Sequence, residues 1–294
     1  MNLCKQNRRP PWLKTRIQYG KDFEDMNNIL TKWSLNTVCR EAACPNISEC
    51  YNQRTATFLI LGDICTRSCA FCAVKKGTPR PVDPQEPERV AQAVKELGLY
   101  HVVITSVTRD DLSDGGAYYF AQTIDAIRKI NSDTIIEVLI PDLKGSPKAL
   151  AIIGNASPHI VGHNVETVSR LYQQVRSTAD YHLSLSIIKM TKGSFLITTK
   201  SGLMVGLGEE KKEILTTMDD LKSVGCDILT IGQYLSPTKN CFPIKRYYHP
   251  QEFEELSREG KERGFQWIEA GPLVRSSFHA SYQWKKAQSN PYGL

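Results

Sequence analysis

Two groups of cysteines are the part of this sequence that points most directly to chemistry. Six of the nine cysteines fall within one 34-residue stretch, in the patterns C-x4-C-x5-C and C-x3-C-x2-C. The first triplet is Cys39, Cys44 and Cys50, and the second triplet is Cys65, Cys69 and Cys72. Cysteine thiolates are the usual protein ligands of iron–sulfur clusters. Two sets of three, so close together, predict two iron–sulfur clusters.

The spacing of the second triplet suits a cluster with one open iron. Three thiolates within eight residues allow a loop to wrap one 4Fe-4S cubane and to hold three of its irons. The fourth iron then has no cysteine ligand. An iron without a protein ligand is free to bind a small molecule.

A structural zinc site and a disulfide framework are the alternatives for the second triplet. Structural zinc usually takes four protein ligands, and no second C-x2-C knuckle or nearby Cys/His pair completes such a set. Disulfides persist in oxidising compartments, whereas a chain of this length without a signal peptide is expected in the cytoplasm. Both alternatives are therefore less favoured than a cluster.

The other three cysteines have no metal-ligand spacing. Cys226 lies in the apolar run VGCDILTI and is expected to be a small buried hydrophobic residue. Cys4 and Cys241 fall in polar segments that contain proline.

The scaffold that must position the second triplet is predicted between Thr55 and Ala270. Short runs rich in β-branched residues alternate there with longer amphipathic stretches, which is typical of a parallel sheet covered by helices. The predicted strands are 57–63, 101–107, 134–140, 159–165, 201–208 and 227–235, and the predicted helices are 86–97, 117–130, 146–153, 166–176, 210–224 and 250–264. A closed (β/α)8 barrel has eight units and about 250 residues. Six units predict an α/β fold with a partial (β/α)6 barrel of the TIM type. The segment 181–190 fits both a strand and one helix face, and we favour a helix.

The carboxyl ends of barrel strands are where active sites usually lie. The second triplet directly follows the first predicted strand, so it falls on that side of the sheet. The same rule points to the stretch 105–116, to Asn164 and Glu166 after the fourth strand, and to Glu209 after the fifth. The stretch 105–116 contains three aspartates that we interpret as turn caps, namely Asp110, Asp111 and Asp114.

The composition is that of a globular protein with a modest positive charge. The chain has 294 residues, of which 41% are hydrophobic, and 37 Lys and Arg against 31 Asp and Glu give a formal charge of +6. No apolar stretch is long enough for a membrane span. The basic residues form only short clusters, so nucleic-acid binding is not indicated, whereas an acidic protein substrate fits the charge. The first 20 residues hold five Lys and Arg and no acid, but Pro10 and Pro11 disfavour a transit-peptide helix, so we expect an ordered or semi-ordered arm.

Several motifs together resemble a known family. The second triplet, in the form GDICTRSCAFC with Phe71 before its last cysteine, resembles the cluster-binding loop of the radical S-adenosylmethionine (SAM) superfamily. The first triplet, which ends 15 residues before Cys65, narrows the resemblance to the lipoyl synthase family. Similarity continues through PPWLK, VVITSVTRDDLSDGGA, EVLIPD, HNVETV, KSGLMVGLGE, LTIGQYL and GPLVRSS. Two positions depart from the family pattern: Phe278 replaces the tyrosine of an R-S-S-Y motif, and Tyr119 stands where histidine is common.

The resemblance implies two 4Fe-4S clusters and SAM as cofactors. The second triplet would hold the cluster that binds SAM, and the first triplet would hold an auxiliary cluster whose fourth ligand is the second serine of the C-terminal motif, Ser277. Arg275 is a candidate for anchoring the region near the auxiliary cluster. The implied SAM contacts are Thr105, Ser106, Asn164, Glu166, Gly206 and Glu209, with Gly202 and Met204 in the same stretch as the last two. Taken alone, Gly206 and Glu209 also fit a tight strand-to-helix connection and a carboxylate at a helix N-terminus.

The activity that the resemblance implies is the insertion of two sulfur atoms at carbons 6 and 8 of an octanoyl chain held on a lysine of a carrier domain. Two SAM molecules would be used per lipoyl group, and the auxiliary cluster would donate the sulfur. The implied partners are octanoylated lipoyl carrier domains, such as 2-oxoacid dehydrogenase E2 subunits and the glycine cleavage H protein, and an electron donor such as ferredoxin or flavodoxin. The chain is expected to be a cytoplasmic monomer with no nucleic-acid or membrane partner.

The expected organisation has three parts. These are an N-terminal extension with the first triplet (1–54), the partial barrel (55–270) and a C-terminal extension with the RSSF motif (271–294). Two rival functions are a different radical SAM enzyme that inserts sulfur or transfers a methylthio group, and a two-cluster electron-transfer protein. The combination of C-x4-C-x5-C with RSSF disfavours the first. A three-cysteine loop on a large βα scaffold disfavours the second, because electron carriers use four cysteines per cluster.

Overall fold

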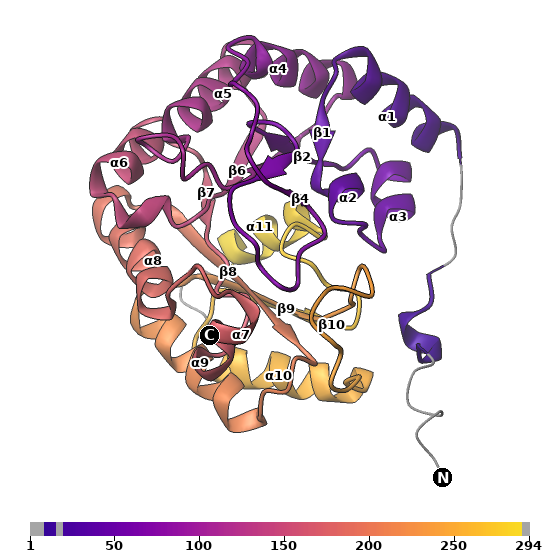
Figure 1. The fold of residues 1–294 in the computed structure, drawn as a ribbon, viewed down its shortest axis with the longest axis vertical. Helices are drawn as coiled ribbons and strands as arrows, with labels where there is room; N and C mark the ends of the chain where they lie inside the picture. Colours follow the sequence, from indigo (N-terminus) through magenta and orange to yellow (C-terminus); the bar gives the residue numbers. More distant parts are fainter. Residues whose placement is uncertain (1–8, 16–19, 290–294) are drawn as a thin grey trace.

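An open and mostly parallel sheet forms the centre of the molecule (Figure 1). The structure, a computed structural model, describes residues 9–15 and 20–289. The strands follow the order β1-β2-β5-β6-β7-β8-β9-β10, in which β1 is antiparallel to β2 and the other neighbours are parallel. Their bounds are β1 (Asn36–Thr37), β2 (Thr57–Ile60), β5 (His101–Ser106), β6 (Ile135–Leu139), β7 (Ile160–Gly162), β8 (Thr198–Val205), β9 (Ile228–Gln233) and β10 (Trp267–Gly271). A second, two-stranded parallel sheet pairs β3 (Ile64–Cys65) with β4 (Lys75–Lys76).

The predicted partial barrel is confirmed, and the sheet extends beyond it. All six predicted strands are present as consecutive parallel neighbours, from β2 to β9. The sequence reasoning missed β10, which continues the parallel order beside β9 with Trp267 opposite Ile228. It also missed β1, a two-residue strand with only two paired positions.

Helices surround the sheet, and their ends follow ordinary capping rules. Their bounds are α1 (Lys21–Lys32), α2 (Val38–Glu41), α3 (Ile47–Asn52), α4 (Glu86–Leu97), α5 (Ala117–Ile130), α6 (Pro147–Asn155), α7 (Tyr172–Val175), α8 (Tyr181–Phe195), α9 (Lys211–Ser223), α10 (Pro250–Glu262) and α11 (Ala280–Ser289), with 3₁₀ turns η1 (Pro11–Leu13), η2 (Leu143–Gly145) and η3 (Ser169–Leu171). α4 has a proline in its first turn and ends at Gly98, whose φ of 63° suits glycine. Glu210 and Glu213 form a capping box at the start of α9. The predictions for 86–97 and 117–130 coincide with α4 and α5, and the segment 181–190 is helical as expected.

The predicted helix 166–176 begins too early and is not one continuous α-helix. Only a 3₁₀ turn and the four-residue α7 form there. Glu166 has a φ of 65°, its N–H donates to Gly202 O at 2.9 Å, and its carbonyl accepts from Met204 N at 2.9 Å. These bonds hold the chain beside β8, so no helix can start at residue 166. Helix α8 covers this part of the sheet instead.

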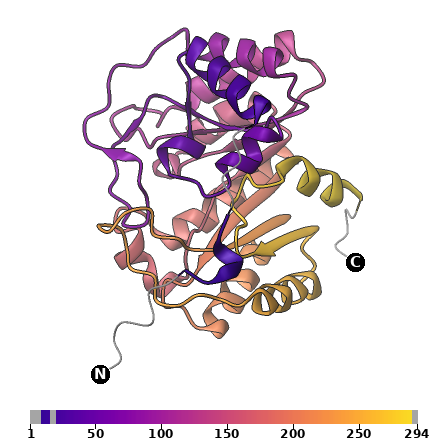
Figure 2. The same ribbon diagram turned by 90° about the vertical axis from the view of Figure 1, so that its right-hand side faces the viewer.

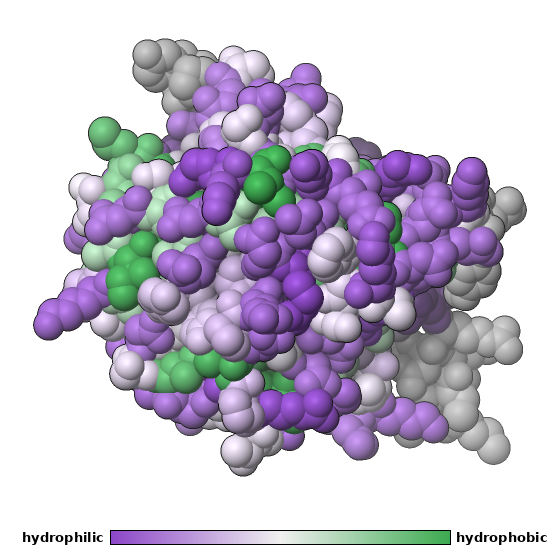
Figure 3. Space-filling view, turned by 90° about the horizontal axis from the view of Figure 1, so that it is seen from above, coloured by the Kyte–Doolittle hydropathy of each residue, from purple (hydrophilic) through white to green (hydrophobic). Residues whose placement is uncertain are grey.

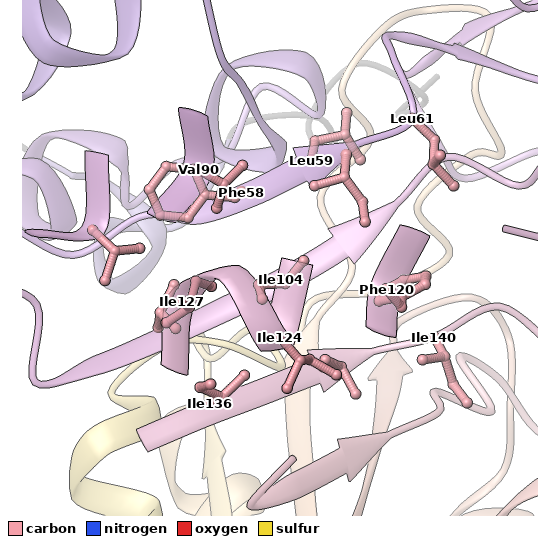
Figure 4. Close-up of a cluster of buried hydrophobic side chains, with 14 of the residues drawn as sticks. Phe58, Leu59, Leu61, Val90, Ile104, Phe120, Ile124, Ile127, Ile136 and Ile140 are labelled. Carbon is pink, nitrogen blue, oxygen red and sulfur yellow. The ribbon is translucent and has the colours of Figure 1, made fainter. Parts of the chain in front are cut away.

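The outer face of β2, β5 and β6 packs against α4 and α5 (Figure 4). Phe58 and Ile104 from the strands meet Val90 from α4 and Phe120 and Ile124 from α5, and at most 1% of any of these side chains is exposed. Because cavities in a packed core are costly, Phe58→Ala would lower the free energy of unfolding by about 3–5 kcal/mol. A second apolar cluster packs α9 and α10 on β8 and β9. The two clusters hold the strand ends in fixed positions around the barrel.

The amino ends of the strands are covered by the C-terminal helix. α11 contacts both β10 and β5, which have four strands between them in the sheet. The ring of Trp284 packs edge-on against His159, and the ring of Tyr282 packs against Trp267. Both partners lie at amino ends of strands, so α11 closes that end of the barrel and leaves the carboxyl ends for a site.

Few features of the surface or of the N-terminal arm add to this picture. Viewed over α4 and α5, the molecule is mainly hydrophilic with scattered apolar side chains (Figure 3). In residues 9–15 and 20–289, no helix is long and apolar enough to cross a membrane.

The described part of the N-terminal arm is ordered, since Leu13 is buried and Trp12 Nε1 donates to Tyr248 O at 3.2 Å. The rest of the predicted arm, with Cys4, lies outside the described residues. Cys226 is buried as expected.

Candidate functional site

A cavity of about 720 Å³ lies at the carboxyl ends of the strands. Its wall includes five of the six clustered cysteines, which are Cys39, Cys44, Cys65, Cys69 and Cys72. Ser276 and Ser277, from the other end of the chain, also line it. Segments that are more than 200 residues apart in sequence therefore face one space.

The loop of the second triplet is folded against neighbouring segments. Cys72 N donates to Cys69 O at 3.3 Å, and Ala70 N donates to Val175 O at 2.9 Å. Burial raises the pKa of the Cys69 thiol and raises that of Cys72 to about 11. Burial outweighs the opposing charge of Arg176 near Cys69, so these thiols are protonated at neutral pH. Iron would therefore bind with release of protons.

Arg67, between Cys65 and Cys69, clamps this loop to two strand ends. Its Nε donates to Asp110 Oδ2 at 2.8 Å, and its Nη2 donates to Asp110 Oδ1 at 2.9 Å and to Asp142 Oδ1 at 2.8 Å. Burial alone would raise the pKa of Asp142, but the hydrogen bond and the charge of Arg67 lower it. Planar bidentate pairs of this kind fix geometry as well as adding energy. The clamp thus sets the position of the second triplet relative to β5 and β6.

The three aspartates after β5 have structural roles. Asp110 holds Arg67, and Asp111 pairs with Arg109, whose Nη2 lies 2.7 Å from its Oδ2. Asp114 accepts from Gly116 N at 2.9 Å and from Tyr118 N at 2.8 Å at the start of α5. None of the three lines the cavity. The interpretation as turn caps is confirmed for Asp114, whereas Asp110 does more than cap a turn.

The first triplet is gathered by two short helices. Cys39 lies in α2, Cys50 lies in α3, and Cys44 N donates to Cys39 O at 3.1 Å in the turn between them. Burial raises the pKa of the Cys39 thiol to about 11 and also raises that of Cys44. The pKa of Cys50 is raised by burial and then by the charges of Cys39 and Cys44. Cys50 is not part of the cavity wall.

The C-terminal segment crosses the cavity beside the first triplet. Asn46 Nδ2 donates to Leu273 O at 2.7 Å, and Thr57 Oγ1 donates to Ser277 Oγ at 2.8 Å. The segment passes so close to β9 that a Cβ on Gly232 would lie 2.0 Å from Val274 O. A side chain at that position would block the crossing. Arg275 is half-buried, and its burial lowers its pKa while the charge of the nearby Cys44 opposes that change.

Four of the predicted strand-end contacts meet at the cavity, namely Thr105, Ser106, Asn164 and Glu166. Asn164 Nδ2 donates to Glu166 Oε1 at 3.0 Å, and burial raises the pKa of Glu166 against the opposing charge of Arg176. A Cβ on Gly202 would lie 2.7 Å from Asn164 Oδ1, so only glycine leaves room for this amide. Met204 also lines the cavity. This half of the wall is polar and tightly packed.

Gly206 and Glu209 lie away from the cavity wall. Glu209 accepts from Gly206 N at 2.6 Å, from Leu207 N at 2.9 Å and from Tyr248 Oη at 2.7 Å. Gly206 has a φ of 100°, which glycine adopts without strain. These contacts fix the turn after β8, in agreement with the structural alternative. A direct contact of either residue with SAM stays a prediction.

Comparison with known sequences gives the family. Residues 59–221 match the radical SAM superfamily, and residues 2–44 match the N-terminal domain of lipoyl synthase. A lipoyl synthase from Caldicellulosiruptor saccharolyticus is 53% identical over 276 residues, which cover 94% of this chain and 97% of that protein. One from Symbiobacterium thermophilum is 51% identical over 288 residues, which cover 98% of this chain and 90% of that protein. The chain belongs to the lipoyl synthase family.

Solved structures support the fold of this lipoyl synthase family member. A methylornithine synthase superposes with a TM-score of 0.55 at 13% identity and covers 83% of this chain and 74% of its own. Streptococcus suis SuiB bound to S-adenosylmethionine superposes with a TM-score of 0.58 at 12% identity, over 76% of this chain and 53% of its own. At such low identity the likeness concerns the fold alone. It agrees with the radical SAM match.

The cavity fits the cofactors of the lipoyl synthase family, which are SAM and 4Fe-4S clusters. The six clustered cysteines are free thiols, the donor type that iron–sulfur clusters take. Within the described ranges, no three His, Cys, Asp or Glu side chains converge as tightly as a single metal ion requires. Several buried polar atoms on the wall have no hydrogen-bond partner there, including Ser106 Oγ, Asn164 Oδ1 and Arg176 Nε. Because buried polar groups are nearly always paired, these atoms indicate a polar ligand.

Two cavity residues were missed by the sequence reasoning. Arg176 is half-buried, its Nη1 donates to Asn164 O at 2.9 Å, and it lies near Cys69 and Glu166. His163 donates from Nδ1 to Ile140 O at 2.9 Å, which leaves its buried Nε2 as an acceptor, and burial lowers its pKa to about 4. Arg176 follows α7, in a stretch interpreted as continuous helix, so no pattern pointed to it. His163 sits at the end of β7, where the strand-end rule could have found it.

Proposed function

We propose that this protein is a lipoyl synthase that inserts two sulfur atoms at carbons 6 and 8 of an octanoyl group held on a lysine of a lipoyl carrier protein. Its family membership supports this reaction. The observation that carries the proposal further is one cavity lined by cysteines of both triplets and by Ser277. Hydrogen abstraction and sulfur transfer at the same substrate carbon need both clusters beside one substrate.

Each cysteine triplet would bind one of the two iron–sulfur clusters. Cys65, Cys69 and Cys72 would hold the cluster that binds SAM. The auxiliary cluster would be held by Cys39, Cys44, Cys50 and Ser277. Thr57 orients the Ser277 hydroxyl, and Asn46 fixes the segment that carries it.

SAM would lie against the polar half of the wall. Thr105, Ser106, Asn164 and Glu166 present hydroxyl, amide and carboxylate groups there, which suits a ligand with an amino acid group and a ribose. The unpaired Ser106 Oγ and Asn164 Oδ1 would find partners on it. Gly206 and Glu209 would act through the turn that they fix after β8.

The chemistry of the unactivated C–H bonds comes from the cofactors, because no protein acid or base can break such bonds. When bound, SAM and its reduced cluster supply a 5′-deoxyadenosyl radical, twice per lipoyl group, and the auxiliary cluster supplies the sulfur. The protein positions the chain and excludes water. Apolar residues on the wall are suited to an octanoyl chain, and they include Val38, Leu59, Val74, Val107, Leu139 and Val274. Arg67 keeps the second triplet fixed while the substrate enters.

The partners and organisation follow from the same proposal. Lipoyl synthases act on lipoyl carrier proteins. We propose 2-oxoacid dehydrogenase E2 subunits and the glycine cleavage H protein as the carriers of this chain, and ferredoxin or flavodoxin as its electron donor. We also propose that it works as a cytoplasmic monomer with parts at 1–54, 55–270 and 271–294. The C-terminal part would supply Ser277 and close the barrel with α11.

Mass spectrometry of an octanoyl-lysine carrier domain tests the reaction. The domain is incubated anaerobically with the cluster-loaded protein, SAM and dithionite. The expected result is the gain of two sulfur atoms with the loss of two hydrogens. Formation of 5′-deoxyadenosine without any gain of sulfur would instead favour a radical SAM enzyme with another substrate.

A further inference from the structure

The positive charge of the chain is concentrated in two segments. Residues 63–80 and 236–249 contain seven Lys and Arg and one acid, Asp63, so together they carry a formal charge of +6. This equals the charge of the whole chain, which has 37 Lys and Arg against 31 Asp and Glu. The formal charges of all other residues, including the basic first 20, therefore sum to zero.

The two segments lie side by side, although they are far apart in sequence (Figure 2). Phe242 N donates to Ala70 O at 2.7 Å, and Cys241 Sγ lies 3.8 Å from Cys72 O. Cys65 pairs with Lys76 in the small β3–β4 sheet. The charged segments are thus built directly onto the loop that carries the second triplet.

The exposed cations of these segments lie outside the cavity wall. Residues 71–74 and 234–237 line its wall, whereas the charged residues that follow them do not. We use the term basic face for the exposed residues Lys75, Lys76, Arg80, Lys239 and Lys245. Lys75 pairs with Asp63 at 2.6 Å. The other four have no ion pair with any described residue, so their charge is available to a partner.

We infer that the basic face is the docking surface for an acidic one-electron donor protein that reduces the cluster of the second triplet. This inference rests on the proposed function, in which one electron passes from the reduced donor to that cluster for each SAM consumed. A protein seated on the basic face is separated from the second triplet only by the loop that carries the face. Electron-transfer encounters are typically small, short-lived and steered by opposite charges. The basic face has the charge for such an encounter.

The octanoylated carrier is the competing acidic partner, and the structure disfavours it here. Its lysine-bound chain must enter the cavity, and none of the residues of the basic face lines the cavity wall. The cavity has a basic residue of its own in Arg9, which lines the wall and is exposed. The carrier is therefore expected to bind at the cavity entrance and to be insensitive to the basic face.

A charge-reversal variant tests the inference on the full-length, cluster-loaded protein. Lys76→Glu, Arg80→Glu and Lys239→Glu are combined, since none of the three contacts the cavity. The matched control combines Lys129→Glu, Lys148→Glu and Lys212→Glu, which makes the same change of charge at exposed positions on α5, α6 and α9. Stopped-flow spectroscopy measures the rate at which each protein oxidises a reduced flavodoxin of negative net charge. Lipoyl formation driven by dithionite is measured in parallel.

The expected result is a fall of about 10- to 1,000-fold in the flavodoxin rate constant at low salt, which shrinks as salt is added. The control should change far less, and dithionite-driven lipoyl formation should be the same in all three proteins. An equal loss in the control, or no loss in the variant, overturns the inference. A raised KM for the carrier with dithionite would assign the surface to the carrier instead. Failure of the wild type to form lipoyl groups with dithionite would refute the proposed function and is a separate result.

Discussion

Thr57 Oγ1 donates a hydrogen bond to Ser277 Oγ at 2.8 Å, across 220 residues of sequence. Thr57 begins β2, and Ser277 belongs to the segment that crosses β9. The bond places the serine hydroxyl on the same cavity wall as Cys39 and Cys44. The two ends of the chain are thereby joined at the proposed auxiliary cluster.

Ser277→Ala is expected to damage the auxiliary cluster and to spare the other one. The variant removes the proposed fourth ligand but leaves the second triplet and its clamp unchanged. Loss of a residue that only hydrogen-bonds to a metal ligand typically costs about 10- to 100-fold in metal affinity or activity. Loss of a ligand itself should therefore lower lipoyl formation at least about tenfold. Iron and sulfide analysis should show fewer atoms retained per chain, while 5′-deoxyadenosine formation continues. The matched control is Ser276→Ala, which also alters a cavity hydroxyl. Unchanged lipoyl formation in Ser277→Ala would sink the ligand assignment.

Asp142→Ala is expected to loosen the second triplet. The exposed fraction is 2% for the Asp142 side chain and 11% for that of Arg67, so the variant leaves a nearly buried guanidinium with one carboxylate instead of two. The free energy of unfolding of the metal-free protein should fall by about 3 kcal/mol in a denaturant titration. The cluster that binds SAM should be lost faster, as followed by visible absorbance.

An exposed pair provides the control for this clamp. Asp219→Ala breaks the pair with Arg263, in which 61% of the aspartate side chain is exposed. Its effect on the free energy of unfolding should stay within about 1 kcal/mol. If both variants lose the same stability and Asp142→Ala keeps its cluster, Arg67 does not act as a clamp.

The sequence predicted the site as far as local spacing and strand order allow. The strand-end rule placed Thr105, Ser106, Asn164 and Glu166 on one cavity because consecutive parallel strands put their carboxyl ends side by side. Ser277 was assigned to the cluster of the first triplet only from the family resemblance, because no pattern in one sequence predicts a contact across 220 residues. Cys39, Cys44, Cys50 and Ser277 stay predictions as ligands of the auxiliary cluster.

The misplaced features have local causes. The helix expected at 166–176 does not begin at residue 166, because Glu166 pairs with β8 in a left-handed backbone conformation. The residue type of Glu166 does not predict that conformation. β10 was missed because its sequence, WIEAG, contains a glutamate and a glycine that strands usually avoid. Arg176 and Arg67 act through tertiary contacts, with Asn164 and with two separate aspartates. Such contacts are visible only once the strands are assembled.

A buried charge network inside the barrel predicts an unusual response to mutation. Lys200 Nζ lies 2.7 Å from Glu137 Oε1, and His101 Nε2 lies 3.1 Å from Glu137 Oε2, with at most 3% of each side chain exposed. Lys200→Met leaves Glu137 without its main partner and should lower the free energy of unfolding by about 3–5 kcal/mol. The double variant Lys200→Met, Glu137→Leu should recover most of that loss, because the pair is then replaced by apolar side chains. A double variant as unstable as the single one would show that lost packing, and not the unpaired carboxylate, is responsible.

The same network sets a pH dependence. Burial alone would raise the pKa of Glu137, but the charge of Lys200 and then His101 lower it to about 2, from an ordinary value of 4.5. A lowered carboxyl pKa stabilises the folded protein fully above pH 4.5, and this contribution is lost as the pH falls from 4.5 towards 2. Denaturant titrations between pH 6 and pH 3 should therefore show a flatter decline in Lys200→Met, Glu137→Leu than in the wild type. Parallel curves would show that Glu137 titrates normally in the folded protein.

Gly202→Ala is expected to weaken SAM binding without unfolding the protein. The added Cβ would lie 2.7 Å from Asn164 Oδ1 and 3.1 Å from Thr230 Oγ1, so the Asn164 amide must move. Its Nδ2 would then lose the bond to Glu166, and two proposed SAM contacts would be displaced together. Equilibrium dialysis of SAM on the cluster-loaded protein should show at least about a tenfold weaker affinity, equivalent to about 1.4 kcal/mol. The matched control is Gly193→Ala in α8, where an added Cβ meets nothing within 4 Å and should stabilise the helix. Equal SAM affinity in the two variants would show that SAM does not contact the Asn164 side of the cavity.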